Sequence, residues 1–213
     1  MTRTSFRVGI KGARTLYYAE RHAARIGSPL NVSITLNLTM LGIAAVDTTA
    51  AFGRLRRERF SPWMRRPPKQ ARVKAGTPTY SYGFENSRDG IACTSRTGPH
   101  NIHVHWAAHV PPARRHDFDC QMVAWVDELA GTQNWPQPAL EVRTIHRPGK
   151  VADYPIKGAS PEIAAHFGRT AEPQGIIFGV RTGTTRNIGP AARRAADKAQ
   201  GIDRRRRKRR PSP

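Results

Sequence analysis

Two histidines separated by one residue are the strongest chemical signal in this sequence. His103 and His105 lie in the alternating segment NIHVHWAAHV (101–110), which has the period of a half-buried strand. Residues two apart on a strand point to the same face, so both imidazoles can bind one divalent cation. The competing interpretation is that the two rings only pack in the sheet. Other residues of the chain are needed to choose between packing and metal binding.

A carboxylate can complete such a site. Glu85 lies near the end of the segment TYSYGFEN (79–86), which we expect to pair with the histidine strand. Mixed nitrogen and oxygen ligands suit Mg²⁺ or Mn²⁺, although an ordinary surface glutamate is equally compatible with the sequence. His100 and His109 are further candidate ligands. Cys93 beside histidines suggests zinc, but no C-x-x-C pair supports that alternative.

Tyr154 and Lys157 form a second chemical pair. A spacing of three places the phenol and the ammonium on one face of a helical turn, within reach of one phosphate. A tyrosine oxygen can attack a phosphodiester and hold it as a phosphotyrosine, while a metal and Lys157 offset negative charge. The same pair is common on ordinary surface helices. Pro155 disfavours helical backbone at the residue before it and predicts that Tyr154 stands at a helix start.

In this order the motifs resemble those of the HUH endonucleases, specifically the rolling-circle replication initiators of plasmids and phages. Residues 34–39 loosely match the family's Thr-rich first motif, His103-Val104-His105 match its histidine motif, and Tyr154 with Lys157 match its tyrosine motif. The resemblance spans about residues 31–170.

The resemblance implies a site-specific, metal-dependent endonuclease and strand transferase. Such an enzyme nicks single-stranded DNA at an origin or hairpin and rejoins it through a phosphotyrosine, which initiates rolling-circle replication. The implied fold is a ferredoxin-like or RRM-like antiparallel sheet flanked by helices, with the histidine strand central and the metal on the sheet face. The chain carries no G-x-x-x-x-G-K-[ST] loop, so unwinding would need a partner such as a host helicase.

Two other interpretations fit the same residues. HUH relaxases carry their tyrosine before the histidines, so Tyr17 or Tyr18 would be the nucleophile of a mobilisation protein, with His109 as a third ligand. A different class of protein, a basic nucleic-acid-binding protein without catalysis, would use the histidines only structurally.

The charge balance favours a polyanionic partner. The chain has 36 Lys and Arg against 15 Asp and Glu, a formal net charge of +21. A basic face that only meets solvent usually carries acids as well. The candidate DNA contacts are Arg54, Arg57, Arg65, Arg66, Arg186 and Arg193.

The surrounding pattern predicts an α+β domain. Alternation predicts strands at 30–41 and 140–146, and helical spacing predicts helices at 47–61, where Pro62 ends the helix, and at 117–131. Residues 61–78 read as a basic loop, and Ser160 with Pro161 predicts a short helix that ends at Gly168. Residues 182–200 read as a loop and a basic helix.

We expect four regions along the chain: a basic N-terminal arm (1–28), an endonuclease domain (29–180), a basic loop and helix (181–199), and a disordered Arg-rich tail (200–213). Two cysteines are too few for a disulfide framework, and no signal peptide or apolar span is evident. The sequence therefore predicts a cytoplasmic protein with no membrane partner.

Overall fold

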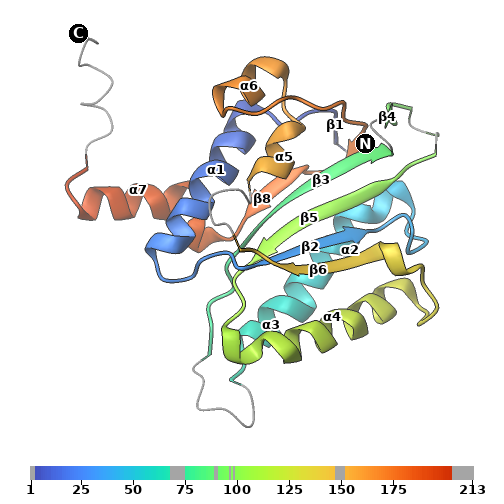
Figure 1. Ribbon diagram of the computed structural model, residues 1–213, viewed down its shortest axis with the longest axis horizontal. Helices are drawn as coiled ribbons and strands as arrows, with labels where there is room; N and C mark the ends of the chain where they lie inside the picture. Colours follow the sequence, from blue (N-terminus) through green and yellow to red (C-terminus); the bar gives the residue numbers. More distant parts are fainter. Residues whose placement is uncertain are drawn as a thin grey trace.

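The computed structural model describes residues 3–67, 75–88, 91–95, 97, 99–146 and 152–202, without the side chains of Arg88, Ala92, Asp153 and Tyr154. These residues form an α+β fold in which an antiparallel sheet has helices on both faces (Figure 1). None of the described helices has the length and apolar character needed to cross a bilayer.

The main sheet has six strands in the order β4-β3-β5-β2-β6, with β8 also paired to β3. The strands are β2 (Val32–Asn37), β3 (Tyr80–Arg88), β4 (Ile91–Ala92), β5 (Ile102–Ala108), β6 (Leu140–Thr144) and β8 (Thr182–Thr184). The expected pairing between the Glu85 strand and the histidine strand is confirmed, because β3 and β5 are antiparallel neighbours. A separate two-stranded sheet joins β1 (Thr4–Ser5) to β7 (Ile177–Phe178).

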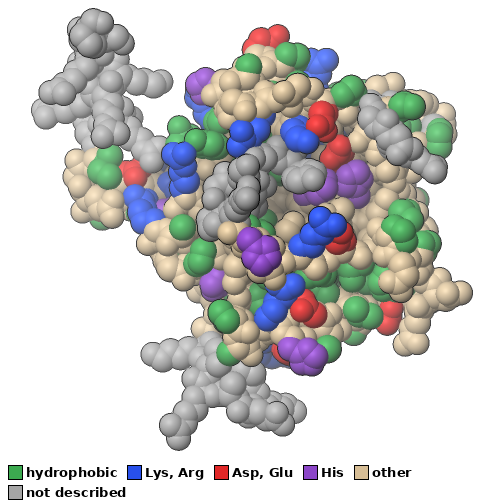
Figure 2. Space-filling model, viewed as in Figure 1, with side chains coloured by type: hydrophobic (Ala, Val, Ile, Leu, Met, Phe, Trp, Pro, Cys, Tyr) green, Lys and Arg blue, Asp and Glu red, His purple; other side chains and the backbone are tan. Residues whose placement is uncertain are grey.

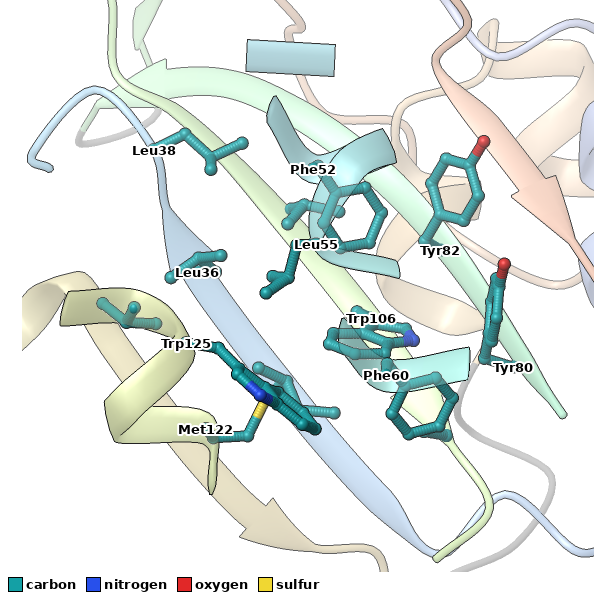
Figure 3. Packing of buried hydrophobic residues seen from close by; sticks show 14 of the residues in the cluster. Leu36, Leu38, Phe52, Leu55, Phe60, Tyr80, Tyr82, Trp106, Met122 and Trp125 are labelled. Carbon is teal, nitrogen blue, oxygen red and sulfur yellow. The ribbon is translucent and has the colours of Figure 1, made fainter. Parts of the chain in front are cut away.

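Strand alternation gives the sheet one apolar face, which holds the main core. On β5 this face carries Trp106, whose ring centroid lies 4.9 Å from that of Phe60 and 5.5 Å from that of Phe52 (Figure 3). The helices that cover this face are α2 (Thr48–Arg54), η2 (Leu55–Phe60), α3 (Ser61–Arg65) and α4 (Arg115–Ala130). Short 3-10 turns join these elements at η1 (Ala45–Asp47), η3 (Pro112–Arg114) and η4 (Gln137–Ala139).

The helix expected to end at Pro62 continues past it to Arg65. Its middle, η2, is π-helical, and Pro62 falls in the first turn of α3, a position where proline is tolerated. The expected loop at 61–78 is therefore wrong over 61–65, while residues 68–74 lie outside the described part of the chain. The predicted helix at 117–131 is confirmed as α4, which ends at Gly131 with a positive φ of 68°.

The opposite face of the sheet carries the polar residues of the strands and is covered in part by helices. These are α1 (Ile10–Arg25), α5 (Asp153–Lys157), α6 (Pro161–His166), η5 (Arg186–Ile188) and α7 (Pro190–Ala199). Ala19 and Ala23 of α1 share a buried cluster with Ala107, which faces the same way as His105. We call this side of the sheet the histidine face.

Two segments differ from the sequence-based expectation. The N-terminal region, which the sequence predicts to be a basic arm, contains the 16-residue helix α1. Residues 182–184 form β8 rather than a loop. β4 pairs only with residues 87–88 of β3, so the same edge of β3 is available at residues 81–83, where β8 pairs. The helix after Ser160 is confirmed as α6, with Pro161 in its first turn. Most of the predicted tail, residues 203–213, lies outside the described residues.

Candidate metal centre

Three side chains from β3 and β5 converge on the histidine face. The strand register sets Glu85 opposite His103 and Gly83 opposite His105. The Nε2 atoms of His103 and His105 lie 3.4 Å and 3.1 Å from Oε2 of Glu85. One ligand atom from each residue lies within 4.8 Å of the others, and no other such group occurs among the described residues. The spacing fits joint binding of one cation.

The Nδ1 atoms of both rings contact residues other than Glu85. Nδ1 of His103 lies 3.2 Å from the carbonyl oxygen of Asn101, to which it can only donate. Nδ1 of His105 lies 3.4 Å from the hydroxyl of Thr35 on β2. A neutral His103 therefore turns the lone pair of Nε2 toward a carboxylate oxygen, which is unfavourable unless a positive species lies between them. That species is either a proton, which makes an ion pair, or a metal ion.

Glu85 is held on its other side as well. Its Oε1 accepts hydrogen bonds from the Ser87 hydroxyl at 2.7 Å and from Nε2 of Gln174 at 3.2 Å. Burial alone raises the pKa of Glu85, but hydrogen bonds from His103, His105 and Ser87 outweigh it and keep that pKa far below its usual value. The carboxylate is therefore ionised, which is the form that binds a metal.

Gln174 is in turn oriented by a buried arginine. Arg181 is 4% exposed and donates to Oε1 of Gln174 at 3.2 Å and to the carbonyl of Phe84 at 3.0 Å. Burial lowers the pKa of Arg181 to about 10, against the opposing effect of the Glu85 charge, so the guanidinium remains protonated at neutral pH. This contact directs the amide nitrogen of Gln174, rather than its oxygen, toward Glu85.

Replacing Gln174 by Ala is expected to weaken Mn²⁺ binding about tenfold, because a ligand that loses its outer hydrogen bond is less well oriented. Calorimetric titration of the full chain with Mn²⁺ measures the change. Gln121→Ala is the control, since Gln121 lies on α4, across the sheet. An affinity that stays within a factor of about two in Gln174→Ala rules out this orienting role.

Helix α5 lies on the histidine face beside the cluster. A Cβ added to Gly83 would lie 3.0 Å from Cγ and 3.4 Å from Cα of Pro155, and closer still to its Cβ. At the other end of α5, a Cβ on Gly158 would meet the side chain of Gln174 at 3.1 Å. Gly83 is paired with His105, and Gln174 bonds to Glu85, so α5 runs along β3 next to the cluster (Figure 1).

Replacing Gly83 by Ala is expected to destabilise the protein by about 1–3 kcal/mol, because the methyl group would overlap the ring of Pro155 and push α5 off the sheet. Thermal or urea unfolding measures the loss. Gly53→Ala in α2 is the matched control, since its Cβ would meet nothing closer than 3.7 Å and favours the helix. Equal stability of the two variants would contradict the close packing of α5 on β3.

The two residues of the tyrosine motif are both on α5. Tyr154 is the second residue of the helix, as Pro155 predicts, and its side chain lies outside the described part of the structure. Lys157 Nζ lies 2.7 Å from Oε1 of Glu172, and both side chains are partly exposed. The structure thus pairs Lys157 with an acid, while the hydrogen bonds to Glu85 come from other side chains.

The further ligand candidates lie apart from the cluster. Nδ1 of His100 is 3.0 Å from the side-chain nitrogen of Asn86, and Nδ1 of His109 is 2.8 Å from the carbonyl of Pro29. Cys93 also stands outside the group of three. A third histidine ligand, which the relaxase alternative requires, is therefore not found among the described side chains.

The tyrosines of the relaxase alternative lie on α1. The Tyr17 hydroxyl accepts a hydrogen bond from Arg21 at 2.7 Å, and its ring packs against Phe167 after α6. Tyr18 lies beside Arg193, with the guanidinium carbon 5.4 Å from the ring centroid. These contacts connect both rings to the helices on this face, and α5 also packs against α1.

The predicted DNA-contacting arginines fall into two groups. The first group lies on the helices that cover the apolar face, opposite the cluster, and is exposed: Arg54, Arg57, Arg65 and Arg66. The second group, Arg186 in η5 and Arg193 in α7, lies on the histidine face. Arg186 is exposed, whereas Arg193 is 8% exposed and counts among the buried residues.

Sequence reasoning missed three residues of the site. Thr35 had a signal, because it faces the same way as His105 on a strand that matches the first motif. Gln174 and Arg181 had none, since they reach Glu85 and Phe84 across 89 and 97 residues of chain. Comparisons of the chain with known protein families, with characterised proteins and with solved structures find no match.

Proposed function

We propose that this protein is a metal-dependent enzyme that nicks and rejoins single-stranded DNA, with Tyr154 as the nucleophile. The observation that carries the proposal is the convergence of His103, His105 and Glu85 on a sheet face that α5 borders. A set of two imidazoles and one carboxylate leaves coordination positions open and also suits iron or zinc, so the donor set alone does not choose a reaction. The choice rests on the neighbouring α5 and on the charge of the chain.

The strand order supports the proposal. With the two-residue strand β4 left aside, the chain runs β2, the α2–α3 helices, β3, β5, α4 and β6, which is a β-α-β-β-α-β order, and the sheet order is β6-β2-β5-β3. This order is consistent with the ferredoxin-like arrangement that the resemblance to HUH endonucleases implies, and so supports the proposal. In this order the histidine strand β5 lies in the middle of the sheet, between β2 and β3. The candidate site lies on the polar face of the sheet.

The net charge of +21 supports a phosphate-rich substrate. Figure 2 shows Lys and Arg side chains spread over the same face as a group of histidine side chains. We infer that the substrate is a single strand of DNA, at an origin or hairpin of a replicating element, and that a host helicase supplies unwinding.

The proposed reaction is a transesterification. The phenolic oxygen of Tyr154 forms a bond to phosphorus, its proton passes to water, and one bond from phosphorus to a deoxyribose oxygen breaks. The leaving oxygen takes up a proton and becomes a free hydroxyl, and the reverse reaction rejoins the strand. When the substrate binds, Lys157 leaves Glu172 and contacts a phosphate oxygen, whose negative charge it offsets. A cation bound by the three ligands would polarise the phosphate.

A second candidate function is binding of nucleic acid without catalysis. The observation that favours it is the direct contact of both histidines with Glu85, which is also the geometry of a structural ion pair. In that case the site holds protons rather than a metal, and the basic surface alone accounts for binding.

Incubation of the full chain with a labelled library of random single-stranded DNA tests the proposal. With Mn²⁺ or Mg²⁺ we expect a DNA-linked protein band that survives denaturation, together with a cut strand, and neither product in EDTA. Absence of the adduct with every divalent metal, while salt-sensitive binding persists, would identify the non-catalytic protein instead. A tyrosine of α1 as the attachment point would identify the relaxase class.

A further inference from the structure

A basic pocket lies between α1 and α7, outside the cluster of Glu85, His103 and His105. It has a volume of about 220 Å³. Its lining consists of one face of α1 and one residue of α7: Tyr18, Arg21, His22, Arg25 and Arg193.

The lining residues of α1 form a single stripe. They are spaced at i, i+3, i+4 and i+7, which places all of them on one side of the helix, toward α7. The guanidinium carbon of Arg193 lies 5.4 Å from the centroid of the Tyr18 ring, so α7 supplies the other wall. Arg21 lies over the Tyr17 ring and uses one of its five N–H groups to donate to the Tyr17 hydroxyl at 2.7 Å.

Hydrogen bonds fix the positions of Arg25 and His22 in the lining of the pocket. Nη1 of Arg25 donates to Asp197 at 3.3 Å and to Gln200 at 3.2 Å, and its Nε donates to Nδ1 of His22 at 3.2 Å. Burial lowers the pKa of His22, and the charges of Arg25 and Arg193 lower it further. His22 is therefore a neutral acceptor that orients Arg25.

Arginines dominate the charged lining of the pocket. Three guanidinium groups, from Arg21, Arg25 and Arg193, face one carboxylate, Asp197, which is 5% exposed and paired with Arg25. A pocket lined mainly by guanidinium groups attracts anions. Arginines present planar sets of N–H donors that match the oxygens of a phosphate. The pocket is suited to one phosphate group.

We propose that the pocket between α1 and α7 binds a phosphate of the DNA backbone, at a distance from the phosphate that reacts. This inference rests on the proposed function for the identity of the polyanion. The pocket lies on helices of the histidine face, so one strand can reach both places. It anchors the strand through its backbone and carries no base specificity.

The test uses the full chain with Tyr154→Phe in EDTA, so that DNA binding is measured without cleavage or metal. Arg21→Ala is expected to weaken binding of fluorescent oligodeoxythymidine about tenfold and to lower the salt slope by about 0.7 for each lost phosphate contact. Arg193→Gln should have the same effect, and melting curves check that it folds. Arg194→Ala, an exposed arginine of α7 outside the pocket, is the matched control and should change affinity less than twofold.

Equal losses in Arg21→Ala and Arg194→Ala would overturn the proposal, because they would show a diffuse charge effect. Thermal stabilisation by inorganic phosphate that disappears in Arg21→Ala, with DNA affinity unchanged, would show a site for free phosphate and would also overturn it. The proposed function fails separately: if the chain with Tyr154 intact forms no adduct in Mn²⁺, the binding results on the pocket still stand.

Discussion

Tyr154→Phe is expected to abolish the covalent protein–DNA adduct and to lower the rate of nicking by at least about 1,000-fold, because the only atom removed is the attacking oxygen. Phe keeps the ring, and residue 154 stands at the start of α5, where its backbone is fixed by the packing of Pro155 on Gly83. DNA affinity and melting temperature should stay close to those of the unaltered chain. Adduct yield on a denaturing gel measures the effect.

Tyr17→Phe and Tyr18→Phe are the matched controls for that experiment, since both remove one phenolic oxygen from α1. Each should leave the adduct in place. If Tyr154→Phe still forms the adduct and one of the α1 variants does not, the enzyme is of the relaxase type and the role assigned to α5 is wrong.

His105→Ala is expected to remove tight Mn²⁺ binding and to reduce nicking by about 100-fold or more, because two remaining side chains cannot hold the cation in one position. The variant also leaves Glu85 with one fewer hydrogen bond in a partly buried position, which costs about 1–3 kcal/mol of stability. Calorimetry with Mn²⁺ and the gel assay measure the two effects separately.

His109→Ala is the control for the metal experiment. His109 follows β5 and contacts the carbonyl of Pro29 instead of the cluster, so its loss should leave Mn²⁺ affinity unchanged. If both His105→Ala and the unaltered chain bind Mn²⁺ equally weakly, the three side chains form a structural ion pair. The non-catalytic interpretation would then hold.

The strands of the site could be predicted from sequence because alternation is a short-range signal. β2, β3 and β5 alternate apolar and polar residues, and their register follows from which side must be buried. Glu85 beside the histidines was therefore a reasonable expectation, and the structure confirms that they meet. That they hold a metal stays a prediction.

Helix α1 was not predicted because its buried side mixes alanines and Leu16 with the polar side chains of Glu20 and His22. Ala13, Ala19 and Ala23 are fully buried, but alanine hardly stands out as apolar in a basic segment. The continuation through Pro62 was missed for another reason: a π-helical stretch precedes the proline and lets it start a new helical turn. The first error concerns polar residues that tertiary packing buries, and the second concerns a local irregularity of the helix; hydrophobic periodicity contains neither.

The support around Glu85 could not be predicted at all. Gln174 lies in an irregular segment between α6 and β7, and its contact with Glu85 depends on where the whole chain returns to the sheet. Arg181, one residue before β8, looked like one more basic residue among many, yet it is buried and holds Gln174. Long-range contacts of single polar side chains leave no local pattern.

The most direct measurement is to identify by mass spectrometry the peptide that carries a nucleotide after the full chain reacts with single-stranded DNA in Mn²⁺. We expect a phosphodeoxynucleotide on the hydroxyl of Tyr154, and no such peptide when EDTA replaces the metal. A modified peptide from α1, or no modified peptide with any divalent metal, would contradict the assignment of this site as a DNA-nicking centre.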